Sequence, residues 1–254
     1  MNVSKNSNIT TAVIVAAGLS TRLYPHTKNL PKCMLHVAGE PMLARSVRCL
    51  KQHGIENIFV VVGYHRQRIE ETLGDTVRYI HNPFYAHCNN MGSFWCARPW
   101  VDGLPMLYLH GDLVYDPKLL AAVLAAPPSE VELLVDFGPV DQEAMKVRVE
   151  NDRFVSSSKD IPIDEAIGEW TGIARFSGQG SHLVFEKLDE LLGAQELQSY
   201  DTLAFTGLAK GEVAFGLTAT NNQAWVEIDD ADDLDRARRM FADQVVCGEG
   251  TVRG

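Results

Sequence analysis

A loop of small and basic residues follows the first strongly apolar segment of the chain, and its residue types suit the binding of a polyphosphate. Gly18 ends the apolar run, the hydroxyl residues Ser20 and Thr21 come next, and Arg22 and Lys32 stand ten positions apart. Backbone N–H groups near a glycine can approach phosphate oxygens because no Cβ obstructs them, and two cations can neutralise a triphosphate. The loop therefore predicts a triphosphate site.

The spacing within this loop excludes two other phosphate-binding motifs. A dinucleotide-binding GxGxxG fingerprint would need glycines where the chain has Ser20 and Leu23. A P-loop would need Gly-Lys-Ser/Thr, which does not occur in the sequence. Neither a dinucleotide site nor a P-loop is expected here.

The loop resembles the signature of the nucleotidyltransferases that join nucleoside triphosphates to sugar phosphates and related small phosphates. The signature Gly-x-x-[Ser/Thr]-Arg-[Leu/Met]-x-Pro-x-Thr-x-x-x-Pro-Lys-x-x-Leu is matched by Gly18, Thr21, Arg22, Leu23, Pro25, Thr27, Pro31, Lys32 and Leu35. One departure is Ser20, where many members carry glycine, so the backbone is expected to be less free there. The resemblance implies that Arg22 and Lys32 are catalytic cations. It also implies nucleotide-binding roles for Ala16, Ala17, Gly18, Ser20 and Thr21.

Carboxylates near the ends of predicted strands are candidate magnesium ligands. Nucleotidyl transfer brings anions together, and a divalent metal offsets their repulsion while it orients the α-phosphate. Magnesium prefers oxygen ligands, and Asp112 follows a buried apolar strand in a position that resembles the family's metal position. Strand alternation would place Glu227 and Asp229 on one face, so that both could reach one ion. The alternatives are a turn role for Asp112 and surface or capping roles for the other two.

The segment around Glu227 resembles the ending of one branch of this family. The order Glu-Ile-Asp-x-x-x-Asp-Leu, at residues 227–234, is similar to that of cytidylyltransferases which use phosphocholine or aminoethylphosphonate. This resemblance makes Asp112, Glu227 and Asp229 the expected Mg²⁺ set. The neighbouring carboxylates are expected to cap and stabilise a helix N-terminus instead; they are Asp230, Asp232 and Asp233.

A segment with two asparagines and a serine is the candidate contact to the nucleotide base. Asn89, Asn90 and Ser93 are similar to an Asn-Asn-x-x-Ser segment that lies beside the base in the same branch. Amide and hydroxyl groups can both donate and accept hydrogen bonds, which suits cytosine. The alternative is that Asn90 and Ser93 are ordinary helix-capping residues.

The acceptor would attack with a phosphate or phosphonate oxygen that is already anionic at pH 7, so no protein nucleophile is expected. Lys146 lies in a Met-Lys-Val segment that resembles one in this branch, and it is the candidate to contact the acceptor phosphate. If the acceptor carries an amine, Trp170 and Asp136 are the candidates to bind it. Simpler roles remain open: a solvent-facing strand position for Lys146 and core packing for Trp170. The eight histidines show no ligand spacing, and none is assigned to a metal.

The elements that would position these residues alternate between strand and helix. Apolar runs at 11–18 and 57–63 predict buried parallel strands on either side of a helix at 40–53. The alternation continues to a strand at 106–110, which predicts a doubly wound α/β domain. Later segments predict short antiparallel or mixed strands at 133–136, 145–150, 153–157 and 170–176, with a turn at 150–152. Helices at 181–192, 200–209 and 230–242 and strands at 213–219 and 225–228 complete the chain.

One domain is expected over the whole chain, because no repeat or flexible linker divides it. The expected fold is a Rossmann-like doubly wound mixed sheet with a small added antiparallel lobe, and the resemblance implies the nucleotide-diphospho-sugar transferase type. Its expected parts run in order along residues 1–254: a polar tail over 1–9, a nucleotide-binding core over about 10–130, an acceptor-side lobe over about 131–200, and a return to the core with the metal-binding segment over about 201–243.

Composition limits the classes of partner. The 254 residues include 23 Lys and Arg against 33 Asp and Glu, for a formal charge of −10, which argues against nucleic-acid binding. No stretch approaches the roughly 18 uninterrupted apolar residues of a membrane span. The polar start lacks the apolar region of a secretory signal, and five cysteines without a CxxC pair fit reduced thiols, so a cytoplasmic location is expected. An oligomer remains possible.

Together these patterns predict a Mg²⁺-dependent cytidylyltransferase. Its partners would be CTP and a small phosphate or phosphonate, which would attack the α-phosphorus and release pyrophosphate. One alternative is a sugar-1-phosphate nucleotidyltransferase that uses UTP, GTP or dTTP. Another is a nucleotide-binding regulatory domain without turnover, although such a domain would not need a trio of metal-binding carboxylates.

Overall fold

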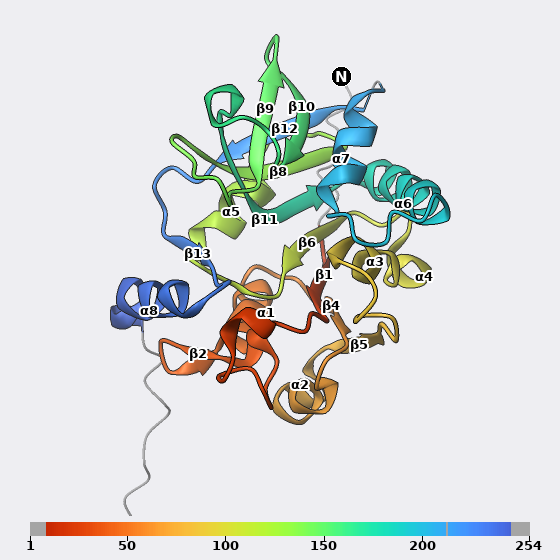
Figure 1. The fold of residues 1–254 in the computed structure, drawn as a ribbon. Helices are drawn as coiled ribbons and strands as arrows, with labels where there is room; N and C mark the ends of the chain where they lie inside the picture. The colour runs from red at the N-terminus through yellow and green to blue at the C-terminus, as the bar shows by residue number, and fades with distance from the viewer. Residues whose placement is uncertain (1–8, 212, 245–254) are drawn as a thin grey trace, which may run out of the picture.

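A nine-stranded mixed sheet forms the centre of the computed structural model, which describes residues 9–211 and 213–244 (Figure 1). Its parallel half has the strand order β6-β1-β4-β5. These strands are β1 (Thr11–Ala16), β4 (Asn57–Val62), β5 (Arg78–His81) and β6 (Met106–His110). β1, β4 and β6 are almost wholly buried, which confirms the interpretation of their continuous apolar runs.

Helices cover both faces of the sheet, and alternate side chains of β1 contribute to the two layers. Val13 and Val15 belong to a core cluster with α3 (Asn90–Trp95), α4 (Arg98–Val101), α6 (Gly178–Gly193) and α7 (Thr202–Ala209). Ala12 and Ile14 belong to a second cluster with α1 (Met42–Gln52), α2 (Arg66–Leu73) and α5 (Lys118–Ala125). The doubly wound α/β fold expected from the alternating pattern is therefore confirmed.

The antiparallel half continues the same sheet. It consists of β8 (Val131–Phe137), β9 (Lys146–Glu150), β10 (Arg153–Ser158) and β11 (Gly168–Phe176). β11 pairs antiparallel with β8 along one edge, and along the other edge it pairs antiparallel with β9 near its start and with β6 near its end, so the added strands extend the core sheet. The predicted turn between β9 and β10 is present, with left-handed backbone at Asn151 and Asp152 as a two-residue hairpin requires.

The last part of the chain, which was predicted over about 201–243, contacts both halves of the sheet. α7 packs against β10, and β12 (Phe215–Ala219) pairs with β8, so both belong to the antiparallel half. The return begins at β13 (Trp225–Glu227), which pairs antiparallel with β7 (Leu113–Tyr115), and α8 (Ala231–Met240) follows it. Phe205 of α7 nevertheless shares a core cluster with Val13 and Val15 of β1, so α7 packs against both halves of the sheet.

A third core cluster holds the loop after β1 against α8. Leu23 of the loop packs in this cluster with Val226 of β13 and Leu234 of α8. The short strands β2 (His36–Val37) and β3 (Glu40–Pro41) lie between the loop and α1. Figure 1 shows α8 beside β2, so segments from opposite ends of the chain lie together here.

Two expectations concern residues at the limits of the described chain. The polar tail predicted over 1–9 lies outside the described residues, apart from Ile9. Four of the five cysteines are free thiols in the structure, and Cys247 lies outside the described part; the four are Cys33, Cys49, Cys88 and Cys96. Within 9–211 and 213–244, no helix combines the length and the apolar character that a membrane crossing needs.

Candidate active site

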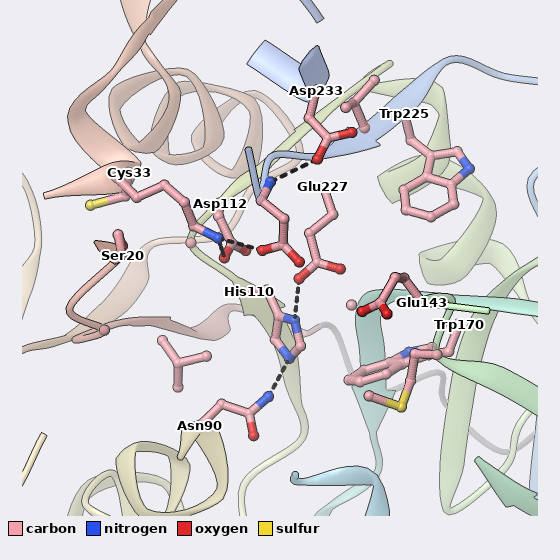
Figure 2. A pocket seen from close by; sticks show the side chains of 18 of the residues that line it. Ser20, Cys33, Asn90, His110, Asp112, Glu143, Trp170, Trp225, Glu227 and Asp233 are labelled. Carbon is pink, nitrogen blue, oxygen red and sulfur yellow. Dashed lines mark hydrogen bonds and ion pairs between the residues drawn. The ribbon is translucent and has the colours of Figure 1, made fainter. Parts of the chain in front are cut away.

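A cavity of about 960 Å³ opens at the carboxyl ends of β1 and β6, the edge where ligands bind in doubly wound sheets (Figure 2). All of the predicted site residues except Lys146 line it. They are Ala16, Ala17, Gly18, Ser20, Thr21, Arg22, Lys32, Asn89, Asn90, Ser93, Asp112, Asp136, Trp170, Glu227 and Asp229. The fold thus brings the predicted phosphate loop, base segment and carboxylates into one space.

The phosphate loop makes its turn at Ser20. Ser20 has a φ of 54°, in the left-handed region that glycine adopts most easily. The hydroxyl of Thr27 donates a 2.7 Å hydrogen bond to the carbonyl of Ser20 and so closes the loop. The serine keeps the backbone path that a glycine would take, which accounts for this departure from the family signature.

The two loop cations contact the predicted metal carboxylates directly. Lys32 Nζ lies 2.6 Å from Asp112 Oδ2 and 2.9 Å from Asp229 Oδ1. Arg22 Nη2 lies 3.0 Å from Asp229 Oδ2. Burial alone would lower the pKa of Lys32, but the adjacent carboxylates of Asp112 and Asp229 raise it above its ordinary value. Burial would likewise raise the pKa of Asp229, but Lys32 and Arg22 hold it below its ordinary value, so both partners are charged at neutral pH.

One observation indicates that the residues of this site suit a divalent metal ion. Asp112 Oδ1 is buried and has no hydrogen-bond partner among the described residues, a costly state for a carboxylate oxygen unless a cation binds it. Ligand atoms of His110, Asp112 and Glu227 all lie within 4.8 Å of one another. Asp229 lies beside this cluster with its two oxygens paired to Lys32 and Arg22, so its role as a metal ligand stays a prediction.

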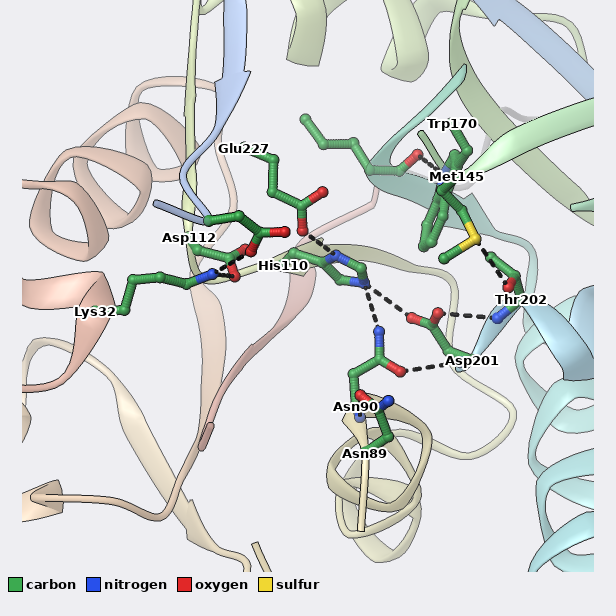
Figure 3. A network of polar contacts seen from close by, with 12 residues as sticks. Lys32, Asn89, Asn90, His110, Asp112, Met145, Trp170, Asp201, Thr202 and Glu227 are labelled. Atoms are coloured by element: carbon green, nitrogen blue, oxygen red, sulfur yellow. Dashed lines mark hydrogen bonds and ion pairs between the residues drawn. The ribbon is translucent and has the colours of Figure 1, made fainter. Parts of the chain in front are cut away.

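His110 is the main site residue that the sequence interpretation missed. Its Nε2 lies 3.0 Å from Asp201 Oδ2 and its Nδ1 lies 3.6 Å from Glu227 Oε1 (Figure 3). Burial would lower the pKa of the imidazole, but Asp201 and Glu227 raise it well above its ordinary value. The available signal was its position two residues before Asp112, which strand alternation places on the same face.

The base segment is held in place by its own amides. The side chain of Asn89 caps α3 by accepting from the backbone N–H of Asn90, and its Nδ2 donates to the carbonyl of Gln198. Asn90 faces His110 and accepts from the backbone N–H of Asp201. Capping therefore belongs to Asn89, whereas the sequence suggested Asn90 or Ser93 for it.

Ser93 lies inside α3 and is buried, where it accepts a 3.0 Å hydrogen bond from Asn82. Ser93 still lines the cavity. Because Asn89, Asn90 and Ser93 line the cavity, they could contact the nucleotide base, and that contact remains a prediction.

Trp170 and Asp136 line the antiparallel side of the cavity. Trp170 is 2% exposed, and its indole N–H donates to the carbonyl of Ile173. Both oxygens of Asp136 are engaged, because Oδ1 accepts from Thr220 and Oδ2 accepts from Trp225. Trp170 therefore combines a core position with a surface on the cavity, and Asp136 holds the wall together.

Lys146 does not contact the cavity, so the acceptor-binding role predicted for it is wrong in this structure. Its side chain is fully buried, and Nζ donates to the carbonyls of Gln142 and Lys159 at 2.8 Å and 2.7 Å. The solvent-facing alternative is wrong as well. Lys159 supplies the cation on this wall instead, with Nζ 3.4 Å from Glu143 Oε2.

Further carboxylates on the antiparallel side were not predicted. Asp141, Glu143 and Glu169 all line the cavity. Burial, with a smaller contribution from Glu227, raises the pKa of Glu169 to about 7. This end of the cavity therefore carries an acidic wall with an aromatic ring beside it. Two of these carboxylates lie in a loop and one lies in β11, and single carboxylates at such positions have no spacing that would predict the wall from the sequence.

Comparison with known proteins finds the model of the MobA-like NTP transferase domain, which matches residues 12–162. The CMP-5'-(3-aminopropyl)phosphonate synthase of Streptomyces rubellomurinus is 29% identical over 91% of this chain and 38% of that protein. The choline-phosphate cytidylyltransferase of Streptococcus pneumoniae is 38% identical over 34% of this chain and 38% of that protein. The chain thus spans well under two thirds of the length of either curated relative.

A solved structure has the same fold. The inositol-1-phosphate CTP transferase from T. maritima superposes with a TM-score of 0.79 at 21% sequence identity, and the match covers 94% of this chain and 99% of that one. The nine-stranded mixed sheet and its helices therefore follow an architecture already known from nucleotidyltransferases.

Proposed function

The chain belongs to the MobA-like NTP transferase domain family, and from that premise we propose that it is a cytidylyltransferase. It transfers CMP from CTP to a small phosphate or phosphonate acceptor and releases pyrophosphate. The relatives named above, a CMP-phosphonate synthase and a choline-phosphate cytidylyltransferase, support this choice of nucleotide and of acceptor class.

One observation carries the proposal: the loop cations and the carboxylates meet in a single cavity. Arg22 and Lys32 reach Asp229 and Asp112 within ion-pair distance. Reaction at the α-phosphate needs cations for the developing negative charge and carboxylates for a metal ion within one small volume. A site that only bound nucleotide would have no need of the unpartnered oxygen of Asp112.

The residues of this chain act by orientation and charge. An acceptor oxygen forms a bond to the α-phosphorus of CTP, and the bond from that phosphorus to the bridging oxygen breaks, with its electron pair leaving on pyrophosphate. Arg22 and Lys32 stabilise the charge on the α-phosphate and the leaving group. Mg²⁺ held by Asp112 and Glu227 would neutralise phosphate charge and orient the α-phosphate. The acceptor is already anionic, so no residue has to remove a proton.

The acidic wall supports an acceptor that carries a positive group at its far end. Asp141, Glu143 and Glu169 lie on the antiparallel side of the cavity, and Trp170 adds an aromatic surface there. A carboxylate attracts an ammonium group, and an aromatic face binds it through a cation–π contact. Lys159 on the same wall suits the acceptor's phosphate or phosphonate, the task first predicted for Lys146.

The test is pyrophosphate release with Mg²⁺ over a matrix of substrates. CTP, UTP, GTP, ATP and dTTP are crossed with aminoalkyl phosphates, aminoalkyl phosphonates, phosphocholine and sugar-1-phosphates. The expected result is turnover with CTP and an amine-bearing phosphate or phosphonate. Product mass spectrometry should show a CMP-linked acceptor.

Two results would contradict the proposal in different ways. Turnover with UTP or dTTP and a sugar-1-phosphate would keep the phosphate loop but overturn the assigned base and acceptor. CTP binding in calorimetry without pyrophosphate release for any acceptor would favour a regulatory domain. Lys28→Ala is the matched control for Lys32→Ala in these assays, because Lys28 is exposed in the same loop and does not line the cavity.

A further inference from the structure

We infer that His110 is itself a metal ligand: its Nδ1 forms a mixed nitrogen and oxygen donor set with Asp112 and Glu227, and Asp201 fixes the ring for that task. The inference deepens the proposed function, which requires a divalent ion at this site. It concerns the metal alone, so it can be tested without nucleotide or acceptor.

The first support is the direction of Nδ1. This atom faces the carboxylate of Glu227 at 3.6 Å, and ligand atoms of both residues lie within 4.8 Å of one from Asp112 (Figure 3). Two ligands bound at about 2.1 Å to the same ion lie at most about 4.2 Å apart, so small side-chain rotations suffice. Asp112 offers Oδ1, the buried oxygen without a partner, because Oδ2 is the oxygen that contacts Lys32.

The second support is the partner of the opposite ring nitrogen. A histidine that binds a metal almost always donates its other N–H to a carboxylate, a carbonyl or a water, which sets the tautomer and the ring angle. Nε2 of His110 lies 3.0 Å from Oδ2 of the fully buried Asp201. The same oxygen accepts from the hydroxyl of Tyr108, and Asp201 Oδ1 accepts from the backbone N–H of Thr202. The carboxylate is thus fixed on both oxygens.

The side-chain amide of Asn90 competes with Asp201 for the same ring nitrogen. Its Oδ1 accepts from the backbone N–H of Asp201, which turns its Nδ2 toward His110 Nε2 at 3.2 Å. One ring nitrogen cannot donate to Asp201 and accept from Asn90 together, and a bond to a charged carboxylate is the stronger of the two. Nε2 therefore keeps its proton, and Nδ1 is the nitrogen that releases a proton and offers its lone pair when a metal binds.

The third support is the space that Gly172 leaves beside Nδ1. Gly172 in β11 has a φ of 80°, and a Cβ built there would lie 3.0 Å from His110 Nδ1. The register of β11 against β8 shifts between Trp170 and Ala174, at this glycine. The irregular strand keeps the metal-facing edge of the imidazole free of side-chain atoms from this position.

An imidazole in the donor set changes which ions the site prefers. Carboxylates and water suit Mg²⁺, whereas imidazole nitrogen favours first-row transition ions. With His110 as a ligand, the site should bind Mn²⁺ and Co²⁺ more tightly than Mg²⁺. Loss of the imidazole should reduce that preference while the two carboxylates continue to bind Mg²⁺.

The direct test is spectroscopy of the nucleotide-free wild-type protein loaded with Mn²⁺. Pulsed electron paramagnetic resonance should detect coupling from a directly bound ¹⁴N nucleus. His110 is the only histidine among the described residues that line the cavity. The variant Asp112→Asn identifies which Mn²⁺ is bound at this site, because that ion should no longer bind to it. If Mn²⁺ bound at this site in the wild type shows no nitrogen coupling, the inference is overturned. It is also overturned if the nucleotide-free protein does not bind Mn²⁺ at all.

Variants supply the second arm, as titrations with Co²⁺ followed by visible absorption. His110→Gln keeps much of the side-chain volume and should raise the Co²⁺ dissociation constant at least about tenfold. His182→Ala is the matched control, because His182 also pairs with an aspartate, Asp102, but lies outside the cavity. It should leave Co²⁺ binding unchanged. Equal Co²⁺ affinity and spectrum for His110→Gln and the wild type would contradict the inference.

Asp201 is a positioning residue for His110, and Tyr108→Phe tests that role without removing the carboxylate. The change removes one hydrogen bond from the Asp201 carboxylate and leaves its bond to His110. The Co²⁺ spectrum should shift, and the Co²⁺ affinity should fall less than it does in His110→Gln. If Tyr108 and Asp201 only stabilised the fold, the melting temperature would change and the Co²⁺ spectrum would not. Failure of the substrate matrix described above would not affect these metal measurements, so the two proposals fail separately.

Discussion

Lys32 Nζ lies 2.6 Å from Asp112 Oδ2, so the cation of the phosphate loop and the carboxylate at the end of β6 already touch before any ligand binds. Lys32 also contacts Asp229, which Arg22 approaches from its other side. A triphosphate that enters the cavity must therefore compete with carboxylates for the loop cations. A metal ion at Asp112 would weaken that ion pair and free Lys32 for phosphate, which links metal binding to nucleotide binding.

Lys32→Ala should lower kcat/KM by at least about 100-fold, since removal of one group that stabilises transition-state charge costs that much in other enzymes. Lys28→Ala should keep wild-type turnover. The measurement is pyrophosphate release with CTP and the best acceptor. A Lys32→Ala protein with an unchanged melting temperature and full turnover would remove this lysine from the mechanism.

Asp112→Asn should abolish most turnover, because the metal contributes several kcal/mol to the transition state and Asp112 offers the free carboxylate oxygen. The melting temperature without metal should change little, since Lys32 retains Asp229 as a partner. Asp232→Asn is the control, because Asp232 is exposed in the first turn of α8. Normal Mg²⁺-dependent turnover in Asp112→Asn would eliminate the metal assignment.

Lys146→Met should lower the free energy of unfolding by about 1–3 kcal/mol, because two partly buried carbonyls lose the charged donor that the buried Lys146 supplies. One of those carbonyls belongs to Lys159, which lines the cavity, and the other belongs to Gln142, whose neighbours Asp141 and Glu143 line it, so the KM for the acceptor should rise as well. Lys159→Met should raise that KM with little loss of stability. Urea unfolding and steady-state kinetics of both variants measure the difference. Equal stability of Lys146→Met and the wild type would contradict this role.

Glu169 should make stability depend on pH between about 4.5 and 7. Its pKa is raised from 4.5 to about 7, so the folded protein keeps a proton that the unfolded chain releases in this window. Stability contributed by the protonated group is full below 4.5, falls as pH rises and levels off above about 7. The loss is up to about 3 kcal/mol at 1.36 kcal/mol for each pKa unit.

Glu169→Gln should remove that decline, and Glu143→Gln, at an exposed side chain on the same wall, should keep it. The measurement is urea unfolding at several pH values in the presence of a chelator. Parallel stability curves for the wild type and Glu169→Gln across this pH window would show that Glu169 is not the responsible group.

The sequence predicted those parts of the molecule whose signals are local. The runs that became β1 and β4 have buried-strand composition, and the turn at Asn151 and Asp152 has the residue types that a two-residue hairpin needs. The capping role of Asp230 and Asp233 was likewise predicted and is present as a capping box. Each of these features depends on a few neighbouring residues.

The parts that were missed depend on contacts between distant segments. The burial of Lys146 is created by carbonyls of Gln142 and Lys159, and its position on a strand gives no sign of them. The place of His110 in the site depends on Asp201 of the α7 cap, which lies far along the chain. A pattern within one strand identifies which side chains share a face, but it does not identify what the rest of the fold brings to that face.

The pairing of β13 with β7 has a consequence for the order of assembly. A growing chain that has been synthesised only as far as β12 possesses the phosphate loop and Asp112, but not Glu227 or Asp229. Domains fold while synthesis proceeds, and closure of so long a loop is slow. The nascent protein thus has Arg22 without its acidic partner Asp229, and its set of candidate metal ligands is complete only once β13 has been synthesised and has paired with β7.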